Sequence, residues 1–579
     1  MSGGAASRKP GVLSALAVYL ERRSLVMLAL GFASGLPNLL IFDTLSAWLR
    51  DAGLSLEVIA VFGLATLAYS AKFIWAPLVD RTEVPILTKW LGHRRSWMLV
   101  TQALIVAGLW LVAGSDPKTS LGLTALFAVF VGFMGATQDI VIDAWRIEAA
   151  PQTEQGALAA AYQWGYRFAT IAAGAIPLLI AEQFNWHLSY AVMGALMLIG
   201  FLGVLGAPRE AAHQIRPIHA DGLAARPALE IPEWIGRLLL FAAGAVLLGS
   251  GLAANASILS AGLTALGRPE AAASLEAAWA AKPAGVFVQL VGVLAGALVI
   301  VVAATPLPGA KTRPGVYLRA ALGEPLKDFF ARYGRTAGVI LALICLYRLG
   351  DFVLNIMNPF YLDLGFTKTQ IAEVRKVFGV AATMAGVFLG GFAVVRLGLM
   401  RALIIGAFAG PLSQFMYVWL AVAGPKTHVL LAAIGVDNIC SGFAGTCLIA
   451  YMSSLTRAGF TATQYALFSS LYSLPGKLLA SQSGRIVESA AQSADNGGAV
   501  AALKSLFAHT PADAFASALA KSHVTPAALG SGYIVFFTYS ALLGLGAIVL
   551  VFVVAAQQRS ATGANPDAEP EAEAKTAAA

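Results

Sequence analysis

Apolar windows of about twenty residues, the length of helix that crosses a bilayer, recur along the whole chain between short polar breaks. Only helices and closed barrels satisfy their backbone hydrogen bonds inside lipid, and windows of this length fit helices. The pattern therefore predicts an all-α polytopic membrane protein. A first group of six spans is expected near residues 24–47, 55–76, 96–114, 120–143, 156–181 and 187–207.

A second group of six apolar windows follows, and two further windows near 235–257 and 284–304 separate the groups. The second group lies near 336–362, 370–394, 399–422, 428–455, 462–487 and 531–556. The total is about 14 transmembrane helices.

The same pattern divides the chain into five segments. Residues 1–23 form an N-terminal segment, and 557–579 form a disordered tail rich in Pro, Glu and Ala. The expected order between them is a six-helix half at 24–207, linkers with the inserted pair at 208–335, and a second half at 336–556 that contains an outer loop at 488–530.

Composition and charge exclude two classes of protein, soluble enzymes and nucleic-acid-binding proteins. Charged residues make up only 12% of the chain, against roughly a quarter in soluble domains, so most of it faces lipid. The net charge of +8 comes from Lys and Arg clusters between apolar runs, a pattern that sets topology and does not indicate nucleic-acid binding. Clusters such as Arg94–Arg95 and Lys311–Arg313 place both termini on the cytoplasmic side.

An internal repeat relates the two groups. The break after the first span reads Asp51–Ser55 (DAGLS), and the break after the seventh reads Asp363–Thr367 (DLGFT). The fifth span of each group opens with a glutamine, Gln155 or Gln464, followed one residue later by Ala-Leu. Two six-helix halves repeated in parallel, with a pathway between them, form the architecture of major facilitator transporters.

Charged residues inside the expected spans need a partner, a water-filled cavity or a function. A charge at the bilayer centre costs roughly 2.5 to 3.5 kcal/mol on insertion scales. The residues concerned are Asp43, Lys72, Asp139, Asp143, Arg167, Arg348, Asp351, Arg375, Lys376, Asp437 and Lys477.

In the first half, Asp139 and Asp143 lie one helical turn apart and share a face. Gln138, Asp139 and Lys72 fall at similar depth, which favours a polar patch for substrate or a titrating carboxylate beside a cation. Asp143 lies closer to the cytoplasmic end, where solvation or a loop contact is the alternative.

In the second half, Arg348 and Asp351 are three residues apart, so they either neutralise each other or line a pathway. Arg167 and Lys477 occupy equivalent positions in the two fifth spans. We expect them to face each other across a central cavity and to present cations to an anionic solute.

The first span contains small and helix-breaking residues near its middle, namely Ser34, Gly35, Pro37 and Asn38. Such residues permit a bend and favour a gate. The alternative is close helix packing, which we prefer for the glycine pairs Gly31/Gly35 and Gly386/Gly390, each four residues apart. Trp164 is either a packing residue or a stacking platform for a sugar ring.

Several stretches resemble AmpG-type muropeptide permeases. In the first half these are Gly31–Pro37 (GFASGLP), Lys72–Arg81 (KFIWAPLVDR) and Thr137–Trp145 (TQDIVIDAW). In the second half they are Tyr347–Asp351 (YRLGD), Asp437–Gly442 (DNICSG) and Ala462–Leu467 (ATQYAL), so the resemblance covers both groups.

The resemblance implies a permease of the bacterial inner membrane, without a cofactor, that imports N-acetylglucosaminyl-1,6-anhydro-N-acetylmuramic acid, with or without peptide, for cell-wall recycling. By the same match, Gln138, Asp139 and Asp143 fall in the family's fourth-helix motif. Lys72, Arg167, Arg348 and Asp351 fall at its other charged positions, and Asn438 in the tenth-helix stretch.

We expect proton coupling, with Asp139 as the candidate carboxylate. Two departures bear on the substrate range: the extra helix pair lies between the halves, where family members often carry extra helices at the C-terminus, and the 488–530 loop is long. The alternatives are a facilitator for another anionic cargo, such as acetyl-coenzyme A, and a non-transporting membrane sensor. No motif for enzyme chemistry is present in the sequence.

Overall fold

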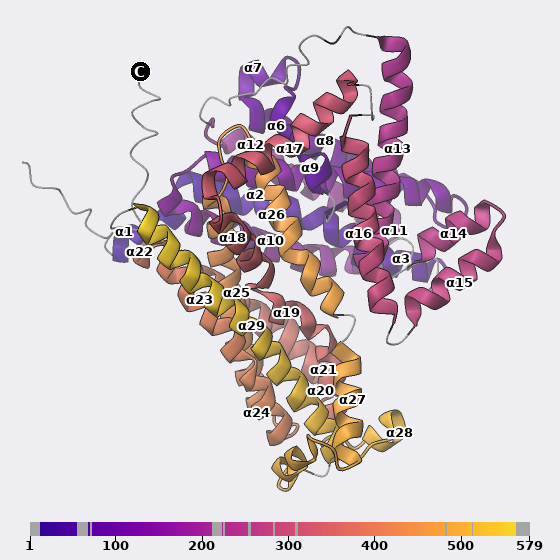
Figure 1. Cartoon of the computed structure of the whole chain (residues 1–579), viewed down its shortest axis with the longest axis vertical. Coiled ribbons are helices and arrows are strands. Elements are labelled where there is room, and N and C mark those ends of the chain that lie inside the picture. Colours follow the sequence, from indigo (N-terminus) through magenta and orange to yellow (C-terminus); the bar gives the residue numbers. More distant parts are fainter. Residues whose placement is uncertain are drawn as a thin grey trace, which may run out of the picture.

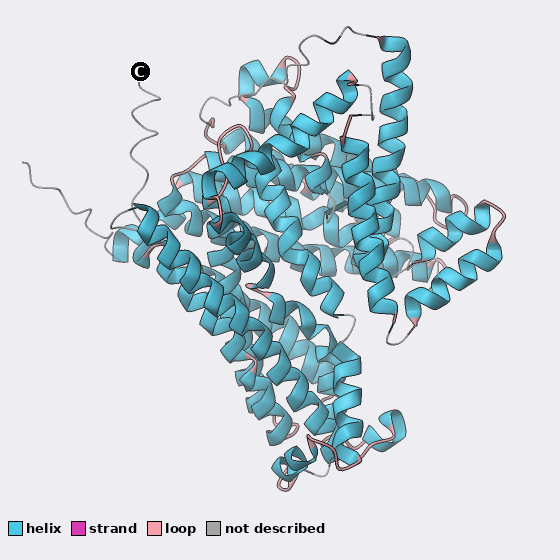
Figure 2. Ribbon diagram, in the orientation of Figure 1, coloured by secondary structure: helices cyan, strands magenta, loops and turns pink. Residues whose placement is uncertain are grey.

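The computed structural model describes residues 12–54, 68–69, 72–210, 223, 226–252, 256–281, 284–306, 311–480, 483–511 and 513–562. Every regular element in these ranges is a helix (Figure 2). Eleven helices are long and apolar enough to cross a membrane, or up to 12 if one bent pair counts as a span. This confirms the all-α polytopic class; most of the expected span 55–76 lies outside the described residues.

The first group begins with one long helix that changes its winding but does not break. α2 (Arg22–Leu39) passes through Pro37 into a π-helical turn (Leu40–Thr44) and continues as α3 (Leu45–Asp51). The irregularity expected at Ser34–Asn38 therefore lies about one turn further along the helix, at Leu40–Thr44, and Pro37 itself stands within regular α-helix. The rest of this group is α6 (Ala76–Arg81), α7 (Leu87–Leu91), α8 (His93–Gly114), α9 (Leu121–Glu148), α10 (Gln155–Gln183), α11 (Trp186–Leu196) and α12 (Leu198–Gly206).

The inserted segment contains more helix than the sequence pattern predicts. α13 (Pro227–Leu252) and α16 (Gly285–Ala304) lie side by side, and α14 (Ser257–Ala265) and α15 (Pro269–Ala280) connect them at one end (Figure 1). At the other end, α17 (Arg313–Tyr333) meets the following helix at 110°. α14, α15 and α17 were not expected, because they are short or amphipathic and lack a membrane-length apolar window.

The second group carries a helical extension at its far end, where Figure 1 labels α27 and α28. α27 (Ser483–Asp495) begins before the expected outer loop 488–530 and runs into it, and α28 (Ala518–Ser522) lies within it, so part of this loop is helical. α27 buries Val487, Ala491 and Ala494, and packs against the last helix. The other helices are α18 (Thr336–Leu346), α19 (Leu349–Val353), α20 (Met357–Leu364), α21 (Lys368–Ala372), α22 (Gly379–Leu397), α23 (Leu399–Ser413), α24 (Phe415–Ala423), α25 (Thr427–Ser454), α26 (Thr461–Ala480) and α29 (Pro526–Thr562).

The repeated turn in the sequence is a repeated turn in the structure. Gly53 and Gly365 both have positive φ, 88° and 108°, a conformation that glycine adopts without strain. In each turn the next residue closes the helix with the same hydrogen bond, from Leu54 N to Leu49 O at 3.1 Å and from Phe366 N to Tyr361 O at 3.0 Å. The carboxylates that precede the glycines are also used alike.

Asp51 Oδ2 accepts a hydrogen bond from Trp186 Nε1, and Asp363 Oδ2 accepts one from Tyr533 OH, both at 2.8 Å. Trp186 and Tyr533 lie on the sixth helices of their groups. Each aspartate therefore joins the first helix of its group to the last.

The glycine pairs serve close packing, as expected. A Cβ atom on Gly31 would lie 2.1 Å from Tyr162 O of α10, and one on Gly386 would lie 2.1 Å from Ile439 O of α25. Such distances are far below van der Waals contact, so only glycine permits these helices to approach so closely.

We predict that Gly31→Ala lowers the free energy of unfolding of the purified protein by roughly 1 to 3 kcal/mol, and with it the Tm, because α2 and α10 must separate. Gly174→Ala on α10 is the matched control, since the nearest atom to its added Cβ is 4.0 Å away. The measurement is the apparent Tm in detergent. Equal Tm values for the two variants would contradict the packing role of Gly31.

Candidate functional site

Most of the described hydrogen bonds that join the two helix groups lie at one end of the bundle, which we call the closed end. It comprises α6, the start of α8, the end of α9 and the start of α26. Arg146 Nη1 donates to Ser453 Oγ at 2.9 Å, and Tyr19 OH donates to Phe388 O at 3.0 Å. The Asp51 and Asp363 contacts at the opposite end stay within their own groups.

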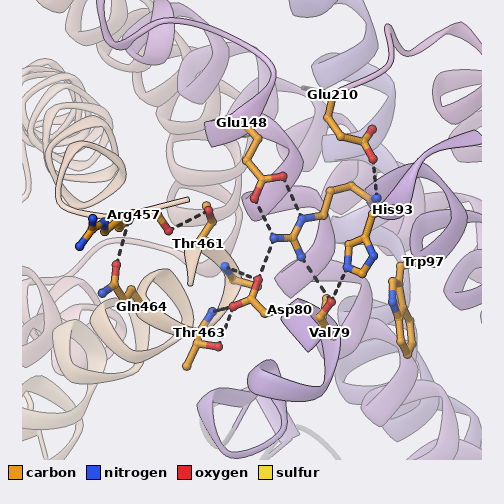
Figure 3. Close-up of polar contacts among 12 residues, drawn as sticks. Val79, Asp80, His93, Trp97, Glu148, Glu210, Arg457, Thr461, Thr463 and Gln464 are labelled. Atoms are coloured by element: carbon orange, nitrogen blue, oxygen red, sulfur yellow. Dashed lines mark hydrogen bonds and ion pairs between the residues drawn. The ribbon is translucent and has the colours of Figure 1, made fainter. Parts of the chain in front are cut away.

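A buried ion cluster organises the closed end (Figure 3). The Arg94 side chain is fully buried, and its Nη2 lies 2.7 Å from both Asp80 Oδ1 and Glu148 Oε1. Arg94 Nε also donates to Glu148 Oε2 at 3.0 Å. Charge-assisted bonds of this kind hold α6, α8 and α9 together.

Asp80 also reaches the other half of the molecule. Its carboxylate accepts hydrogen bonds from the backbone N–H groups of Ala462 and Thr463, at 3.2 and 2.8 Å, and from Thr463 Oγ1 at 2.7 Å. These N–H groups belong to the first turn of α26, where a helix has free donors and a positive dipole end. Asp80 therefore caps α26 from the opposite half, as Figure 3 shows.

Sequence reasoning did not find this cluster. The sequence assigns Arg94 only to the basic residues that set topology, and Asp80 only to a stretch that carries the resemblance. The available signal was an acid-base pair, Asp80–Arg81, before a short break and a pair of arginines, Arg94–Arg95, after it.

Two contacts between the halves lie deeper in the bundle. Gln163 Nε2 donates to Thr446 Oγ1 at 2.7 Å, and Trp164 Nε1 donates to Met384 O at 2.9 Å. The Trp164 ring also packs near Phe388, with ring centroids 6.5 Å apart. These contacts give Trp164 a packing role between the halves, which is one of the two roles expected for it.

The first half contains the polar cluster that the sequence singled out, with different pairings. Ser34 Oγ donates to Asp139 Oδ1 at 2.5 Å and lies 2.6 Å from Tyr162 OH. Asp139 is thus bound by a residue of the proposed helix gate. Gln138 is fully buried, and its amide makes no hydrogen bond within the described residues.

Lys72 lies beside Asp143 rather than forming its ion pair with Asp139. Lys72 Nζ is 3.7 Å from Asp143 Oδ2, and Arg146 Nη2 is 3.4 Å from Asp143 Oδ1. Asp143 is buried between these two cations and is not a solvated end residue. It connects the polar cluster with Arg146, which contacts the other half.

Two further gate residues, Gly35 and Asn38, contact α10. Asn38 Nδ2 donates to Tyr166 OH at 3.0 Å. A Cβ atom on Gly35 would lie 2.9 Å from Tyr166 O, so Gly35 serves packing at the same place. The two observations join the middle of α2 to the face of α10 that carries Tyr162 and Tyr166.

The second half contains a polar pocket of about 230 Å³. Within it, Arg348 and Asp351 form a 2.7 Å ion pair, and Arg348 also donates to Ser441 Oγ at 2.6 Å. Tyr472 OH accepts a further bond from Arg348 at 3.2 Å. Arg348 therefore has an internal counter-charge and also lines a cavity, so both expected roles are consistent with its position.

Residues of α25 and the helices around it complete this pocket. Asp437 accepts hydrogen bonds from Ser413 Oγ at 2.9 Å and from Tyr417 OH at 2.8 Å. Asn438 Oδ1 accepts one from Thr383 Oγ1 at 3.2 Å. Arg375, which donates to Asn358, lines the pocket from the π-helical turn Glu373–Phe378.

The expected pairing of Arg167 with Lys477 stays a prediction, because it involves a contact beyond the side chains that the structure describes. The side chain of Lys477 lies outside them. Arg167 is exposed on α10, one turn beyond Gln163, and is close enough to Arg348 for the two charges to interact. The two halves thus bring Arg167 and Arg348 toward one another.

The chemistry of this arrangement suits the recognition of a solute. Guanidinium, carboxylate, amide and hydroxyl groups line the site, a set suited to a polar solute with negative charge. The described residues contain no group of three or more His, Cys, Asp or Glu side chains placed to bind a metal ion.

Comparison with known proteins adds family information to this geometry. Residues 23–479 match the model of the Major Facilitator Superfamily. The chain is 29% identical over 459 residues to the anhydromuropeptide permease of Escherichia coli (strain K12), covering 79% of this chain and 72% of that protein. It is 27% identical over 474 residues to a putative transporter AmpG 4 of Rickettsia conorii, covering 81% and 91%.

Two solved structures share the fold at 12% identity. They are the proton:xylose symporter XylE, with a TM-score of 0.52 over 93% of this chain and 96% of that one, and FucP, with a TM-score of 0.51 over 93% and 99%. At this identity the likeness concerns the arrangement of the helices alone.

Proposed function

Because the chain belongs to the major facilitator superfamily, we propose that it is an AmpG-type permease that imports anhydro-muropeptides across the bacterial inner membrane by alternating access. The observation that carries the proposal is the similarity to an anhydromuropeptide permease across both helix groups. In this proposal the halves correspond to residues 24–207 and 336–556, and segment 208–335 holds the inserted pair.

The charge distribution supports a cytoplasmic position for the closed end and both termini. Arg94 and Arg95 lie at this end, and so does α17, with Lys327, Arg332 and Arg335 at or just after its C-terminus. Positive charge accumulates on the cytoplasmic side of membrane proteins. With the cytoplasmic end closed by Asp80 and α26, the pathway opens toward the periplasm, the side from which an importer loads its substrate.

The sites fit an anionic sugar peptide. The second-half pocket offers Arg348 and Arg375 for a carboxylate, and Asn438 and Ser441 for hydroxyl or amide groups. The first half offers Asp139, which is bound to Ser34 on the proposed gate helix. Loss or gain of a proton at Asp139 changes the charge at this contact, which couples protons to the position of α2.

We predict that Arg348→Gln raises the KM for anhydro-muropeptide by roughly 10- to 100-fold, the effect of losing a charged hydrogen bond of 1.5 to 3 kcal/mol. The double variant Arg348→Gln/Asp351→Asn restores charge balance and separates a structural role from substrate binding. Arg401→Gln, an exposed arginine of α23, is the control. Recovery of the normal KM in the double variant would contradict a binding role for Arg348.

Uptake of radiolabelled anhydro-muropeptide tests the proposed function in cells that lack their own permease. We expect uptake that depends on this protein and is sensitive to an uncoupler. Absence of uptake despite confirmed membrane expression would contradict the proposal. In that event, the same cells should be tested with coenzyme A esters and other anionic sugars.

A further inference from the structure

The inserted helices enclose a large apolar groove outside the polar pathway. Its volume is about 840 Å³, within the range of roughly 300 to 1,000 Å³ typical of ligand pockets. One wall is formed by the first half, with Trp75 and Phe133, and the other by α13, with Phe241 and Ala245. Tyr317 of α17 closes it at one end.

The groove has the length of one membrane leaflet. The α13 residues that line it run from Trp234 to Val246, and the twelve helical rises between them, at about 1.5 Å each, extend for about 18 Å. Half of a hydrocarbon core of ~30 Å is about 15 Å. Because α13 and α9 are membrane-length helices, the medium beside this groove is hydrocarbon, and the lining side chains are almost all apolar.

The end of the groove at α17 carries polar and charged groups. Arg81 of α6 lies 2.8 Å from Glu324 of α17, so this is the closed end of the bundle. The Trp234 and Tyr317 rings lie 6.0 Å apart at this end, as aromatic residues do at a membrane interface. α17 meets the next helix at 110° and exposes Leu326 and Phe330, as expected for a helix lying in the interface plane.

Positive charge is in excess at this mouth. Residues 226–237 and 311–317 contain four cations and two carboxylates, Glu230 and Glu233. Glu233 is engaged by Arg237 at 2.8 Å, and Glu230 lies 3.8 Å from Arg313, whose side chain is 44% exposed. Lys311 is exposed beside it. An anionic headgroup matches this excess.

We propose that this groove is a binding site for one anionic phospholipid of the leaflet at the closed end, with its acyl chains between α13 and the first half and its headgroup at Lys311 and Arg313. The lipid fills the space between the inserted helix pair and the transport unit. The site gives the inserted pair a function that is independent of the substrate.

Native mass spectrometry of the full-length protein, purified in mild detergent and exposed to equal amounts of phosphatidylglycerol and phosphatidylethanolamine, tests the site. We expect one retained phosphatidylglycerol in the wild-type protein. Ala245→Trp, which fills the groove, should reduce this occupancy at least tenfold, whereas Leu239→Trp, on the exposed face of the same helix, should not. Lys311→Gln/Arg313→Gln should remove the preference for the anionic lipid.

Equal lipid retention by Ala245→Trp and Leu239→Trp would overturn the site. A wild-type protein that appears in the spectrum as a dimer without bound lipid would also overturn it. Equal binding of both lipids by the wild-type protein would overturn the headgroup assignment. If Ala245→Trp does not fold, brominated phosphatidylglycerol provides a second test, because bromine quenches nearby tryptophan. Quenching should be smaller in Trp234→Phe than in the wild-type protein, and identical quenching would refute the placement of the lipid.

Discussion

Asp139→Asn is expected to abolish the accumulation of anhydro-muropeptide while leaving its downhill exchange in place. Asp139 is a buried carboxylate that accepts a hydrogen bond from Ser34 of α2. α2 is the helix that must move in the proposed cycle. Asparagine preserves the shape and the hydrogen bond but cannot bind or release a proton. Gradient-driven transport therefore stops, and substrate can still equilibrate.

The expected size follows from the membrane potential. One charge moving through ~150 mV releases about 3.5 kcal/mol, which supports a concentration ratio of roughly 300-fold. Asp139→Asn should reduce the accumulation ratio from this range to about one. The measurements are accumulation at steady state and counterflow between equal concentrations, each at two external pH values.

The control for this experiment is Asp116→Asn, which removes a carboxylate from the turn between α8 and α9, outside the polar cluster. It should transport as the wild-type protein does. Normal, pH-dependent accumulation by Asp139→Asn would contradict the coupling role.

Arg94→Gln is expected to open the closed end. Removing one partner from a buried ion cluster costs about 3 to 5 kcal/mol, because Asp80 and Glu148 remain buried without their counter-ion. Asp80 is also the cap of α26, so the cost falls on the state in which the two halves touch. The ratio of closed to open molecules should decrease at least about a hundredfold.

Alkylation of a single cysteine measures this change. The three native cysteines are replaced, and Ala160, whose Cβ lies 2.9 Å from a Cβ built on Gly391 of the other half, becomes the reporter. Labelling by a membrane-impermeant reagent from the closed-end side should accelerate in Arg94→Gln. Arg95→Gln is the matched control, because among the described residues the Arg95 guanidinium donates to Val204 O, which lies within its own half. Equal labelling of both variants would refute the gate.

The helices can be predicted from the sequence where the membrane fixes their length and their apolar character. A bilayer demands apolar windows of fixed length, and this requirement is visible residue by residue along the chain. The repeated turns were predictable for a similar reason, since Gly53 and Gly365 must adopt positive φ whatever surrounds them. The short or amphipathic α14, α15 and α17 satisfy no such local rule.

The pairings between side chains within the site depend on the fold, so they were harder to predict from the sequence. Lys72 and Asp139 are at similar depth, yet the direction of each helix face brings Lys72 to Asp143 and Ser34 to Asp139. The partners of Asp80 are the N–H groups of Ala462 and Thr463, which lie in the other helix group. Sequence spacing identifies neighbours on one helix, as for Arg348 and Asp351, but not neighbours across two halves.

The most direct test of the proposed transport activity is uptake by the purified protein in proteoliposomes. Vesicles that contain the protein, with an inside-negative potential and an acidic exterior, are supplied with radiolabelled anhydro-muropeptide. The account predicts concentrative uptake that collapses to equilibration when a protonophore is added, and that is absent in protein-free vesicles. Failure of correctly folded, reconstituted protein to move this substrate under any gradient would contradict it.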